Sequence, residues 1–512
     1  MQPDTHMTGP DTDLPAEVDA LDPPVPGAPG DRLQWGSAHG AALALAITRS
    51  AEHLGRPLLV VAVDVQGASR LAHELKFFAG PDGPPVQVFP DWETLPYDVF
   101  APLPELVSER LAALHQLPRM KQGILVAPVH TLMQRLCARE YVEAHTFLLK
   151  VGDRLVLEDT RRNLERAGYH CVSQVMAHGE FAVRGSLLDL FPMGGADAFR
   201  IDLFDDEVDS IRTFDPETQR SLHKVEEIRL LPAREFPVHE EAVTAFRQRW
   251  RETFEGDPQR SLIYRDVSNG HLPGGIEYYL PLFFEQTATL FDFLPEGTLA
   301  IFPHDAQDIA GEFFDQVTSR YEQRRHDVER PLLPPAELFL DPGQVQARIN
   351  RLPGIAFQPH SVTERRKGYS SFVNLDACVP PPLGLQARAT RPAGLIQDFL
   401  AAHTGRVLFV AESAGRREAL LETLNGFGIR PRTVTDWQAF MTTDEQTCIT
   451  AARVEQGMVL QRSGITLVAE TQLLGERVSQ RRRRKAKSDS EQVIRNLTEL
   501  REGSPVVHEE HG

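Results

Sequence analysis

A buried strand that leads directly into a helix is encoded by the residues Pro57-Leu-Leu-Val-Val-Ala-Val-Asp-Val-Gln-Gly-Ala-Ser-Arg-Leu-Ala-His-Glu-Leu-Lys-Phe-Phe78. The apolar run at 57–65 predicts a strand buried on both faces, and the spacing of apolar residues over 67–78 predicts a helix. Outward from this stretch, the same alternation predicts helices at 41–54 and 105–117 and strands at 86–89 and 123–129. Such alternation is typical of an α/β fold with a doubly wound parallel sheet, which we expect here.

The chain is long and acidic. Its 512 residues exceed the size at which a single hydrophobic core stops growing, so we expect about three or four domains. The formal net charge of −18 argues against a protein that binds nucleic acid by broad electrostatic attraction, because such binding needs clustered Lys and Arg. Any contact of this chain with DNA should therefore be secondary.

The cysteines and the N-terminal residues bear on metal binding and on the compartment. Cys137, Cys171, Cys378 and Cys448 lie too far apart for zinc-ligand spacing or a redox pair, so we interpret them as reduced thiols and predict no metal site. The acidic, Pro-rich N-terminus has no apolar targeting segment, and no apolar run approaches the roughly 20 residues that span a bilayer. We expect a cytoplasmic protein with no membrane contact.

A second stretch places one arginine among aromatic residues, in the sequence Gly168-Tyr-His-Cys-Val-Ser-Gln-Val-Met-Ala-His-Gly-Glu-Phe-Ala-Val-Arg-Gly-Ser-Leu-Leu-Asp-Leu-Phe-Pro-Met-Gly-Gly195. Phe181 and Val183 alternate like strand residues, and Gly185 indicates a turn directly after Arg184. Because arginine and aromatic residues are enriched at protein interfaces, the pattern predicts a docking surface. The alternative is an ordinary hairpin that carries a solvated arginine.

Two further units follow from the pattern of apolar residues. A helix at 155–167 and paired strands at 201–204 and 211–214, around the turn Asp205-Asp206-Glu207, surround the arginine hairpin. Nearer the end of the chain, helices at 393–400 and 416–427 alternate with strands at 407–411 and 464–470, which predicts a small α/β unit. The turn at 412–417 lacks the phosphate-loop motif, and helix capping by Ser413 explains it.

The first strand-to-helix turn, Trp35-Gly-Ser-Ala-His-Gly-Ala-Ala42, lies where a doubly wound sheet holds nucleotide phosphates. A working phosphate loop ends in Gly-Lys-Ser or Gly-Lys-Thr, because the lysine reaches the phosphates and the hydroxyl ligates magnesium. Neither residue is present, and the first lysine of the chain is Lys76. We therefore interpret Gly36 and Gly40 as vestigial and assign no catalytic residue and no cofactor to this chain. The alternative is residual nucleotide binding through backbone N–H groups.

Several dispersed segments resemble one family. The phrase Phe181-Ala-Val-Arg-Gly-Ser-Leu-Leu-Asp-Leu-Phe-Pro192 resembles the UvrA-interaction module that the excision-repair protein UvrB shares with the transcription-repair coupling factors, or Mfd proteins. Other segments are similar to the coupling factors alone: Asp91-Trp-Glu-Thr-Leu-Pro-Tyr-Asp98, Gly275-Ile-Glu-Tyr-Tyr279, Leu282-Phe-Phe284, Leu473-Leu-Gly-Glu-Arg477 and Pro505-Val-Val-His-Glu-Glu-His-Gly512. The similarity runs from about residue 31 to the last residue, which makes it more specific than one short motif.

The resemblance implies that UvrA is the partner of the arginine hairpin. Arg184 and Phe191 match motif positions of the family's binding surface, and Tyr169 and Phe181 flank them. Where many relatives carry arginine this chain has His170, which lacks the permanent charge and the bidentate fork, so the interface is expected to be weaker or pH-sensitive. For Phe191 a core position beside Pro192 is the alternative, and Arg184 is the residue on which we expect binding to depend.

The resemblance also implies a domain plan. We expect these segments in order: a disordered tail at 1–30, the first part of a degenerate helicase-like α/β domain at 31–137, an inserted α+β UvrA-interaction domain at 138–222, the second part of the α/β domain at 223–355, a small α/β domain at 356–475, a basic linker at 476–492 and the incomplete start of an RNA-polymerase interaction domain at 493–512. The basic run Arg481-Arg-Arg-Arg-Lys-Ala-Lys487 is expected to be a solvated linker, with contact to phosphates or to an acidic partner as the alternative.

The family implies a function for the whole protein that exceeds this chain. A coupling factor uses ATP and magnesium in its motor domains to translocate on double-stranded DNA, displaces stalled RNA polymerase and recruits UvrA to begin nucleotide excision repair. No motor motif is found here, so we expect a non-catalytic, UvrB-like N-terminal region that ends inside the polymerase-binding domain. The alternative is an autonomous ATP-dependent DNA-binding enzyme of the UvrB or helicase type that uses the Gly36 loop.

Overall fold

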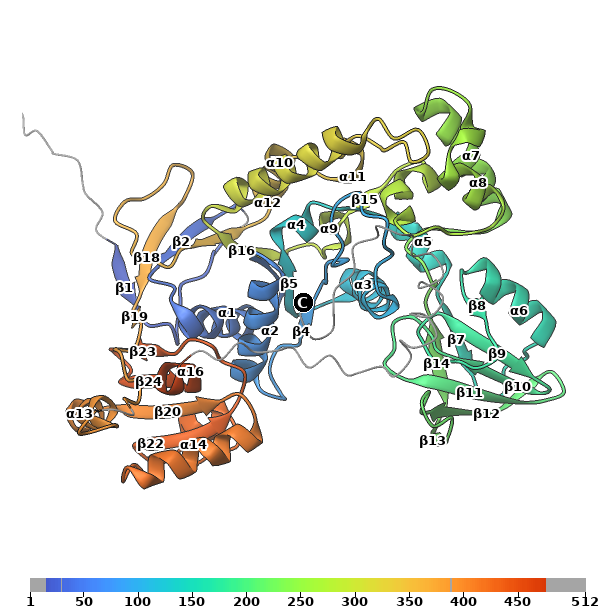
Figure 1. The fold of residues 1–512 in the computed structure, drawn as a ribbon. Coiled ribbons are helices and arrows are strands. Elements are labelled where there is room, and N and C mark those ends of the chain that lie inside the picture. Colours follow the sequence, from blue (N-terminus) through green and yellow to red (C-terminus); the bar gives the residue numbers. More distant parts are fainter. Residues whose placement is uncertain (1–14, 29, 387–388, 476–512) are drawn as a thin grey trace, which may run out of the picture. The chain divides into compact units, whose positions relative to one another are not determined.

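The computed structural model describes residues 15–28, 30–386 and 389–475 (Figure 1). The chain divides into two units, Met1–Gly475 and Glu476–Gly512, and the described residues all belong to the first. The predicted basic linker at 476–492 and the predicted start of a polymerase-binding domain at 493–512 lie outside the described residues.

An eight-stranded sheet forms the centre of the first domain. Its strand order is β1-β18-β2-β17-β16-β3-β5-β4, and every neighbouring pair is parallel. The strands are β1 (Ala16–Val18), β2 (Arg32–Gly36), β3 (Pro57–Ala62), β4 (Val86–Val88), β5 (Gly123–Pro128), β16 (Leu299–Pro303), β17 (Gly354–Phe357) and β18 (Ser371–Leu375). The expected α/β fold with a parallel sheet is confirmed.

Helices cover both faces of this sheet because its strands are apolar on both sides. Leu58 and Val60 of β3 pack in one core with α1 (Gly40–Leu54) and α2 (Val65–Ala79), whereas Leu59 and Val61 pack in the core on the opposite face. That second core holds α3 (Pro104–Gln116), α4 (Val129–Leu132), α10 (Ala306–Arg324) and α12 (Pro342–Ile349). The strand and helix predicted from residues 57–78 are therefore present as β3 and α2, and β3 is buried on both faces as expected.

Short elements and a helical segment complete the first domain. They are η1 (Leu117–Arg119), β6 (Arg135–Leu136), α5 (Arg139–Ala144), α7 (Glu240–Thr253), η2 (Pro258–Arg260), α8 (Leu262–Ser268), η3 (Ile276–Phe283), β15 (Ala288–Thr289), α9 (Leu290–Phe293) and α11 (Pro335–Leu338). Their aromatic residues join the core that contains α3, as Trp250 and Phe283 do. Among the described residues, no helix is both long and apolar enough to cross a bilayer.

An α+β domain is inserted between α5 and α7. Its six-stranded sheet has the order β13-β12-β11-β10-β9-β8, beside α6 (Leu157–Arg166) and a two-stranded sheet of β7 (Phe147–Lys150) and β14 (Glu227–Leu230). The six strands are β8 (His170–Cys171), β9 (Glu180–Arg184), β10 (Leu187–Leu190), β11 (Ala198–Phe204), β12 (Glu207–Phe214) and β13 (Ser221–Val225). The predicted pairing around residues 205–207 is confirmed, since Ile201 lies opposite Ile211.

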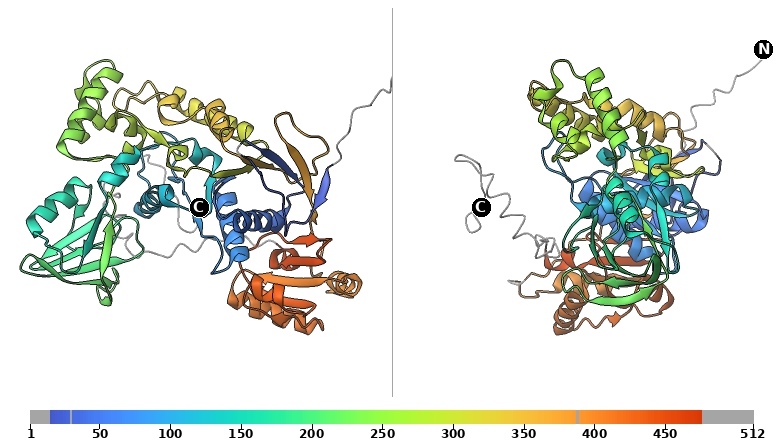
Figure 2. Two further views of the ribbon diagram at one scale, coloured as in Figure 1. Left: turned by 180° about the vertical axis from the view of Figure 1, so that it is seen from behind. Right: turned by 90° about the vertical axis from the view of Figure 1, so that its right-hand side faces the viewer.

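The last described domain is a second, smaller α/β unit. Its six-stranded sheet has the order β19-β23-β24-β20-β22-β21, seen at the lower left of Figure 1 and from behind in Figure 2. Its elements are β19 (Ala377–Cys378), α13 (Gly394–Ala402), β20 (Arg406–Ala411), α14 (Ala414–Gly426), β21 (Arg432–Thr433), α15 (Trp437–Thr442), β22 (Thr447–Ala451), β23 (Met458–Leu460), β24 (Ile465–Ala469) and α16 (Glu470–Leu474). Ser413 caps α14 as predicted, because its side chain accepts a hydrogen bond from the Arg416 N–H.

Two predicted boundaries of the first domain are wrong. The segment 1–30 was expected to be a disordered tail, but Ala16–Val18 forms β1 and pairs with β18, and the Trp35 indole donates to the Pro24 carbonyl. An edge strand gains main-chain hydrogen bonds without large side chains, which the composition argument overlooked. The second part of the domain reaches residue 375 instead of 355, because β18 pairs with β2 in the same sheet.

Candidate partner-binding surface

The arginine hairpin forms as the sequence predicts. β9 and β10 pair with Arg184 opposite Leu187, and the two-residue turn between them begins at Gly185 with φ +63°. Glycine suits this position because a residue with a side chain rarely adopts a positive φ. The turn therefore places Arg184 at the exposed end of β9, with 48% of its side chain accessible.

Arg184 is part of a charged network centred on a buried carboxylate. Asp189, on β10, has a side chain that is only 3% exposed and accepts hydrogen bonds from Arg200 Nε at 2.7 Å and Nη2 at 2.9 Å. Arg184 Nη2 lies 3.4 Å from the same carboxylate. The hydrogen bond to Asp189 raises the pKa of Arg200, so that Arg200 keeps its charge. The network ties β9, β10 and β11 together on one face of the sheet.

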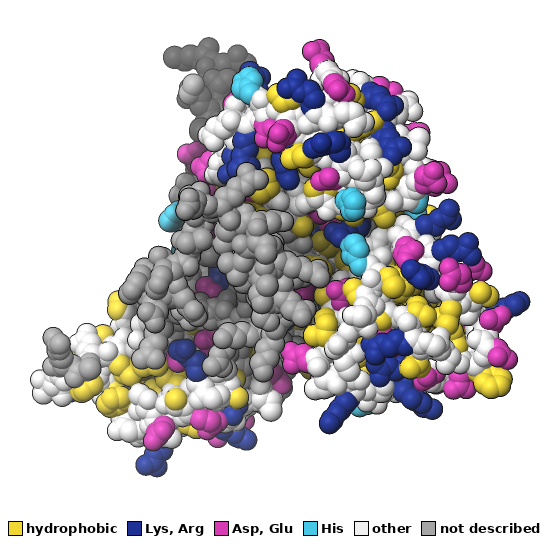
Figure 3. All heavy atoms as spheres, turned by 45° about the vertical axis from the view of Figure 1, so that its right-hand side comes forward, with side chains coloured by type: hydrophobic (Ala, Val, Ile, Leu, Met, Phe, Trp, Pro, Cys, Tyr) yellow, Lys and Arg dark blue, Asp and Glu magenta, His cyan; other side chains and the backbone are white. Residues whose placement is uncertain are grey.

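The same face carries a row of cations across neighbouring strands. Arg200 lies opposite Arg212, and Arg212 lies opposite Lys224, so three positive side chains stand in register on β11, β12 and β13; we call these three residues the basic row. Asp202 lies 3.6 Å from Arg212 and is one partial counter-charge. Like charges directly opposite each other destabilise a sheet, and here Asp189 and Asp202 offset part of that repulsion. Figure 3 shows Lys and Arg side chains gathered on the lower side of this domain.

His170 lies on the edge strand β8 and contacts Arg234. Arg234 Nη2 lies 3.0 Å from His170 Nε2, and because arginine only donates, this ring nitrogen must accept. Burial and then the charge of Arg234 lower the pKa of His170. Near neutral pH the side chain is therefore an uncharged acceptor, and any effect of its protonation falls in the acid range.

The aromatic residues that were predicted to form the surface lie beneath it. Tyr169 and Phe181 are buried, and the Tyr169 hydroxyl donates to the Leu231 carbonyl at 2.7 Å. Phe191 is also buried and packs in a small apolar cluster with Phe214, which matches the alternative reading of a core position. Tyr169 and Phe181 belong to the large core and Phe191 to the small cluster, so these rings do not form the predicted docking surface. A partner role for Arg184 and His170 stays a prediction.

A buried ion pair attaches the inserted domain to the first sheet. Arg110, on α3, binds Glu235 through Nε at 2.5 Å and Nη2 at 3.2 Å, and both side chains are almost fully buried. The Trp92 indole donates to the same carboxylate at 3.2 Å, and the Arg110 guanidinium lies over the Phe89 and Trp92 rings. The acidic-aromatic segment 91–98 thus has a structural role at the base of the insert.

The loop at 35–42, which the sequence interpretation takes as a vestigial phosphate loop, is closed by hydrogen bonds within the protein. The Ser37 N–H donates to the His360 carbonyl at 3.0 Å, and the Ala38 N–H donates to the Gln358 carbonyl at 3.1 Å. A Cβ on Gly36 would lie 2.0 Å from the Asn374 side chain. Because a phosphate is held by free N–H groups, this geometry disfavours the alternative of nucleotide binding at the loop.

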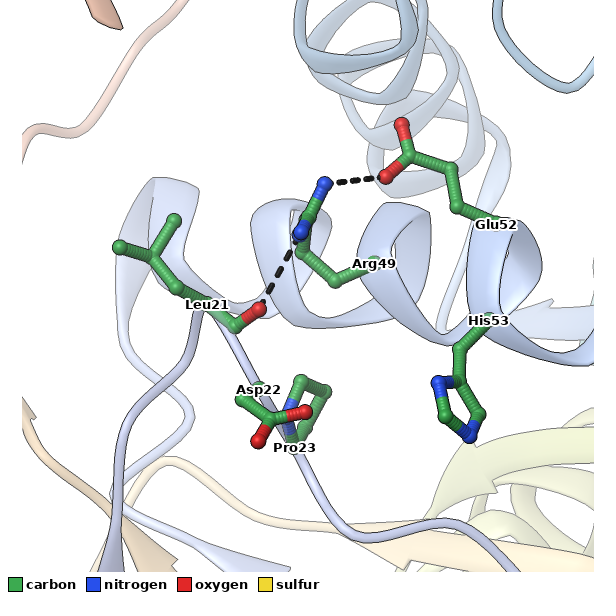
Figure 4. A pocket seen from close by; sticks show the side chains of 6 residues that line it. All are labelled: Leu21, Asp22, Pro23, Arg49, Glu52 and His53. Carbon is green, nitrogen blue, oxygen red and sulfur yellow. Dashed lines mark hydrogen bonds and ion pairs between the residues drawn. The ribbon is translucent and has the colours of Figure 1, made fainter.

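A surface pocket of about 280 Å³ lies beside α1 (Figure 4). It is lined by Leu21, Asp22, Pro23, Arg49, Glu52 and His53. Arg49 Nε donates to the Leu21 carbonyl at 3.0 Å and so holds the N-terminal segment against the helix. Arg49 also pairs with Glu52, so this guanidinium is engaged within the protein. Among the described residues, no group of three or more His, Cys, Asp or Glu is placed to hold a metal ion.

Comparison with known proteins identifies the region. The family model for the UvrB interaction domain matches residues 147–236, and that for the MFD D3 domain matches residues 399–473. The transcription-repair-coupling factor of Haemophilus influenzae is 42% identical over 497 residues, which cover 96% of this chain and 42% of the relative. That of Escherichia coli is 41% identical over 485 residues, covering 94% and 42%, and that of Bacillus subtilis is 23% identical over 500 residues, covering 92% and 41%.

The chain is similar over almost its whole length to the transcription-repair-coupling factors. It spans 42% of the length of the Haemophilus and Escherichia coupling factors. The match to the UvrB interaction domain extends to residue 236, so the predicted end of the insert at 222 is wrong. That limit would cut β13 and omit β14, which pairs with β7 to close the domain.

The sequence interpretation missed most of the charged network. Asp189, Arg200, Arg212 and Lys224 were not singled out. The register of β11 and β12 shifts between Asp202 and Leu203, and that of β12 and β13 shifts between Arg212 and Phe214. The two pairings of like charges therefore do not follow from counting outward from the turns.

Proposed function

We propose that this chain provides the UvrA-binding surface of a transcription-repair-coupling factor, and that Arg184 and the basic row are its contact region. The observation that carries the proposal is the set of cations on one face of the sheet in the UvrB interaction domain, of which Arg184 and Lys224 are exposed. Asp189 and Asp202 balance part of this charge within the domain, and an acidic partner would pair with the exposed cations Arg184 and Lys224.

The geometry defines the chemistry of the complementary surface. Arg184 reaches the solvent while Asp189 holds it from behind, so its guanidinium is partly oriented before binding. Arginine binds carboxylates through two parallel hydrogen bonds, and orienting its side chain in advance reduces the entropy lost on binding. We therefore propose that UvrA presents Asp or Glu side chains to this face.

We place the rest of the coupling factor's activity outside this chain. We propose that the whole protein displaces stalled RNA polymerase by ATP-driven translocation on double-stranded DNA, and that ATP and magnesium act in domains beyond this region. The hydrogen-bonded Gly36 loop supports this division of labour. The region described here would then act by recruiting the excision-repair machinery.

Titration calorimetry of this chain against UvrA tests the proposal. The Arg184→Ala variant is expected to weaken binding by about tenfold or more, as for an arginine at the centre of an interface. The matched control is Arg154→Ala, since Arg154 is an exposed arginine of the same domain and pairs with Asp206 at 3.3 Å. It should bind UvrA like the unmodified chain.

The melting temperature separates binding from folding. Both arginines lie on the surface, so both variants should melt close to the unmodified chain. Equal affinities for the two variants would refute the assignment of Arg184. Loss of UvrA binding in both would indicate that the contact depends on the overall charge of the domain and would overturn the specific role of the network.

A further inference from the structure

A loop of the last described domain reaches the end of α1 where a nucleotide would bind. The Ala41 N–H, in the first turn of α1, donates to the Gln456 carbonyl at 3.2 Å. Gly40 has φ +47°, and a Cβ placed on it would lie 2.6 Å from the Gly457 carbonyl oxygen. The loop between β22 and β23 therefore puts carbonyl oxygens where an ATP-binding relative of this fold would put phosphate oxygens.

A second contact between the two domains holds the C-terminal end of α2, the helix that packs beside α1. Gln438, on α15, donates to the carbonyls of Phe78 and Ala79 at 2.9 and 3.2 Å, and these are terminal carbonyls of α2. Trp437 packs edge-on against the Phe78 ring with centroids 5.0 Å apart. Terminal carbonyls need partners because the helix itself supplies none, so this contact is a C-terminal cap donated by another domain.

The two contacts border a continuous hydrophobic core. Residues of α1 and α2 belong to one buried cluster with residues of the smaller sheet, including Leu408, Val410, Met458 and Leu467. Figure 1 shows β23 close to α1. The polar contacts therefore lie at the edges of an apolar interface that is already closed to water.

We propose that the loop at 452–457 has replaced a nucleotide as the ligand of the first domain, so that the first and last described domains form one cooperative folding unit. Bound nucleotide stabilises a domain of this type only while it is present. A loop of the same chain stays at high effective concentration and makes the stabilisation permanent. This role for the smaller α/β domain does not depend on UvrA binding.

Hydrogen exchange on this chain tests the inference through Gln438→Ala. Loss of the cap from α15 should loosen the interface, so amides at 37–45 and 453–460 should exchange roughly tenfold faster. The matched control is Gln397→Ala, because Gln397 makes a similar bond to the Phe427 carbonyl, at 2.9 Å, inside the smaller domain. That variant should leave exchange at 37–45 unchanged.

A pair of glycines at the two ends of α1 provides an independent test. Gly40→Ala pushes a methyl group into the loop, whereas Gly55→Ala meets nothing within 4 Å at a similar φ of +55°. Both changes carry the strain of a positive φ, so the difference between them reports on the loop contact alone. Calorimetry should show one transition for Gly55→Ala and two for Gly40→Ala.

Several outcomes would overturn the inference. Equal exchange at 37–45 in Gln438→Ala and Gln397→Ala would do so, as would a single transition in both glycine variants. Added Mg-ATP should change neither exchange nor melting of the unmodified chain. Protection of residues 37–45 by Mg-ATP would mean that the loop gives way to nucleotide and that the site has kept its original ligand. A Gly40→Ala variant that fails to fold leaves the glutamine pair as the deciding test.

Discussion

Glu74 lies in α2 with its side chain fully buried, and Arg70 Nη1 is 3.6 Å from its carboxylate. Burial raises the pKa of Glu74 to about 7, although Arg70 opposes the shift. A buried acid with a raised pKa takes up a proton on folding. Its effect on stability is therefore unfavourable above its unfolded pKa and grows as the pH rises toward the folded pKa.

Replacement of Glu74 by glutamine is expected to stabilise the protein at high pH. The raised pKa of Glu74, about 7 against an ordinary 4.5, corresponds to up to about 3 kcal/mol at pH 8 and to almost no effect at pH 4.5. Urea unfolding at pH 5, 6.5 and 8 should show the difference between the variant and the unmodified protein growing with pH. Glu312→Gln, at an exposed position of α10, is the control and should show no such trend. A constant difference across this range would contradict the assignment.

At the scale of the sheet, the carboxylate of Asp189 joins Arg184 of β9 to Arg200 of β11. Replacing it by asparagine would leave Arg200, which is mostly buried, without its charge partner. We expect the free energy of unfolding to fall by about 2 to 4 kcal/mol, because breaking a buried ion pair strands the remaining charge. Urea unfolding of Asp189→Asn measures this change.

The control for Asp189 is the exposed pair on the same domain. Asp206→Asn removes the partner of Arg154, whose side chain is 80% exposed, so stability should hardly change. Equal losses in the two variants would mean that Asp189 acts through the β9–β10 pairing and not through its charge. A loss of UvrA binding without a loss of stability would assign Asp189 to the contact itself.

The elements themselves were largely predictable, because their signals are local. Residues 57–78 carry the apolar spacing of a buried strand and a helix, and β3 and α2 formed there. The turn at 205–207 predicted the β11–β12 hairpin for the same reason. The burial of Phe181 was not predictable from its neighbourhood, because strand alternation does not say which face of the sheet meets the core.

Interactions between distant segments escaped the sequence interpretation. β18 joins β2 across more than 300 residues, so the domain limit at 355 could not be corrected from local composition. The contact of Gln456 with the end of α1 has the same character, as has the pair of Arg110 with Glu235. Polar residues with distant partners look like ordinary surface residues in a sequence.

At the scale of the whole described region, the Arg110–Glu235 pair joins the inserted domain to the first sheet. Both charges are buried, so removing one should cost more than removing both. Arg110→Met is expected to lower the free energy of unfolding by about 3 to 5 kcal/mol. In the double variant Arg110→Met/Glu235→Gln, the glutamine can still accept from the Trp92 indole, and we expect a recovery of about 1 kcal/mol or more.

A double-mutant cycle by urea unfolding measures this coupling, with the pair of Arg391 and Asp398 as the control. That pair is exposed on both sides and 2.8 Å apart, so the effects of Arg391→Met and Asp398→Asn should add. If the Arg110 and Glu235 effects also add, the two side chains contribute separately to the two domains. If they couple as expected, the inserted domain is held to the sheet by a buried charge pair, and the surface of Arg184 is presented from a fixed base.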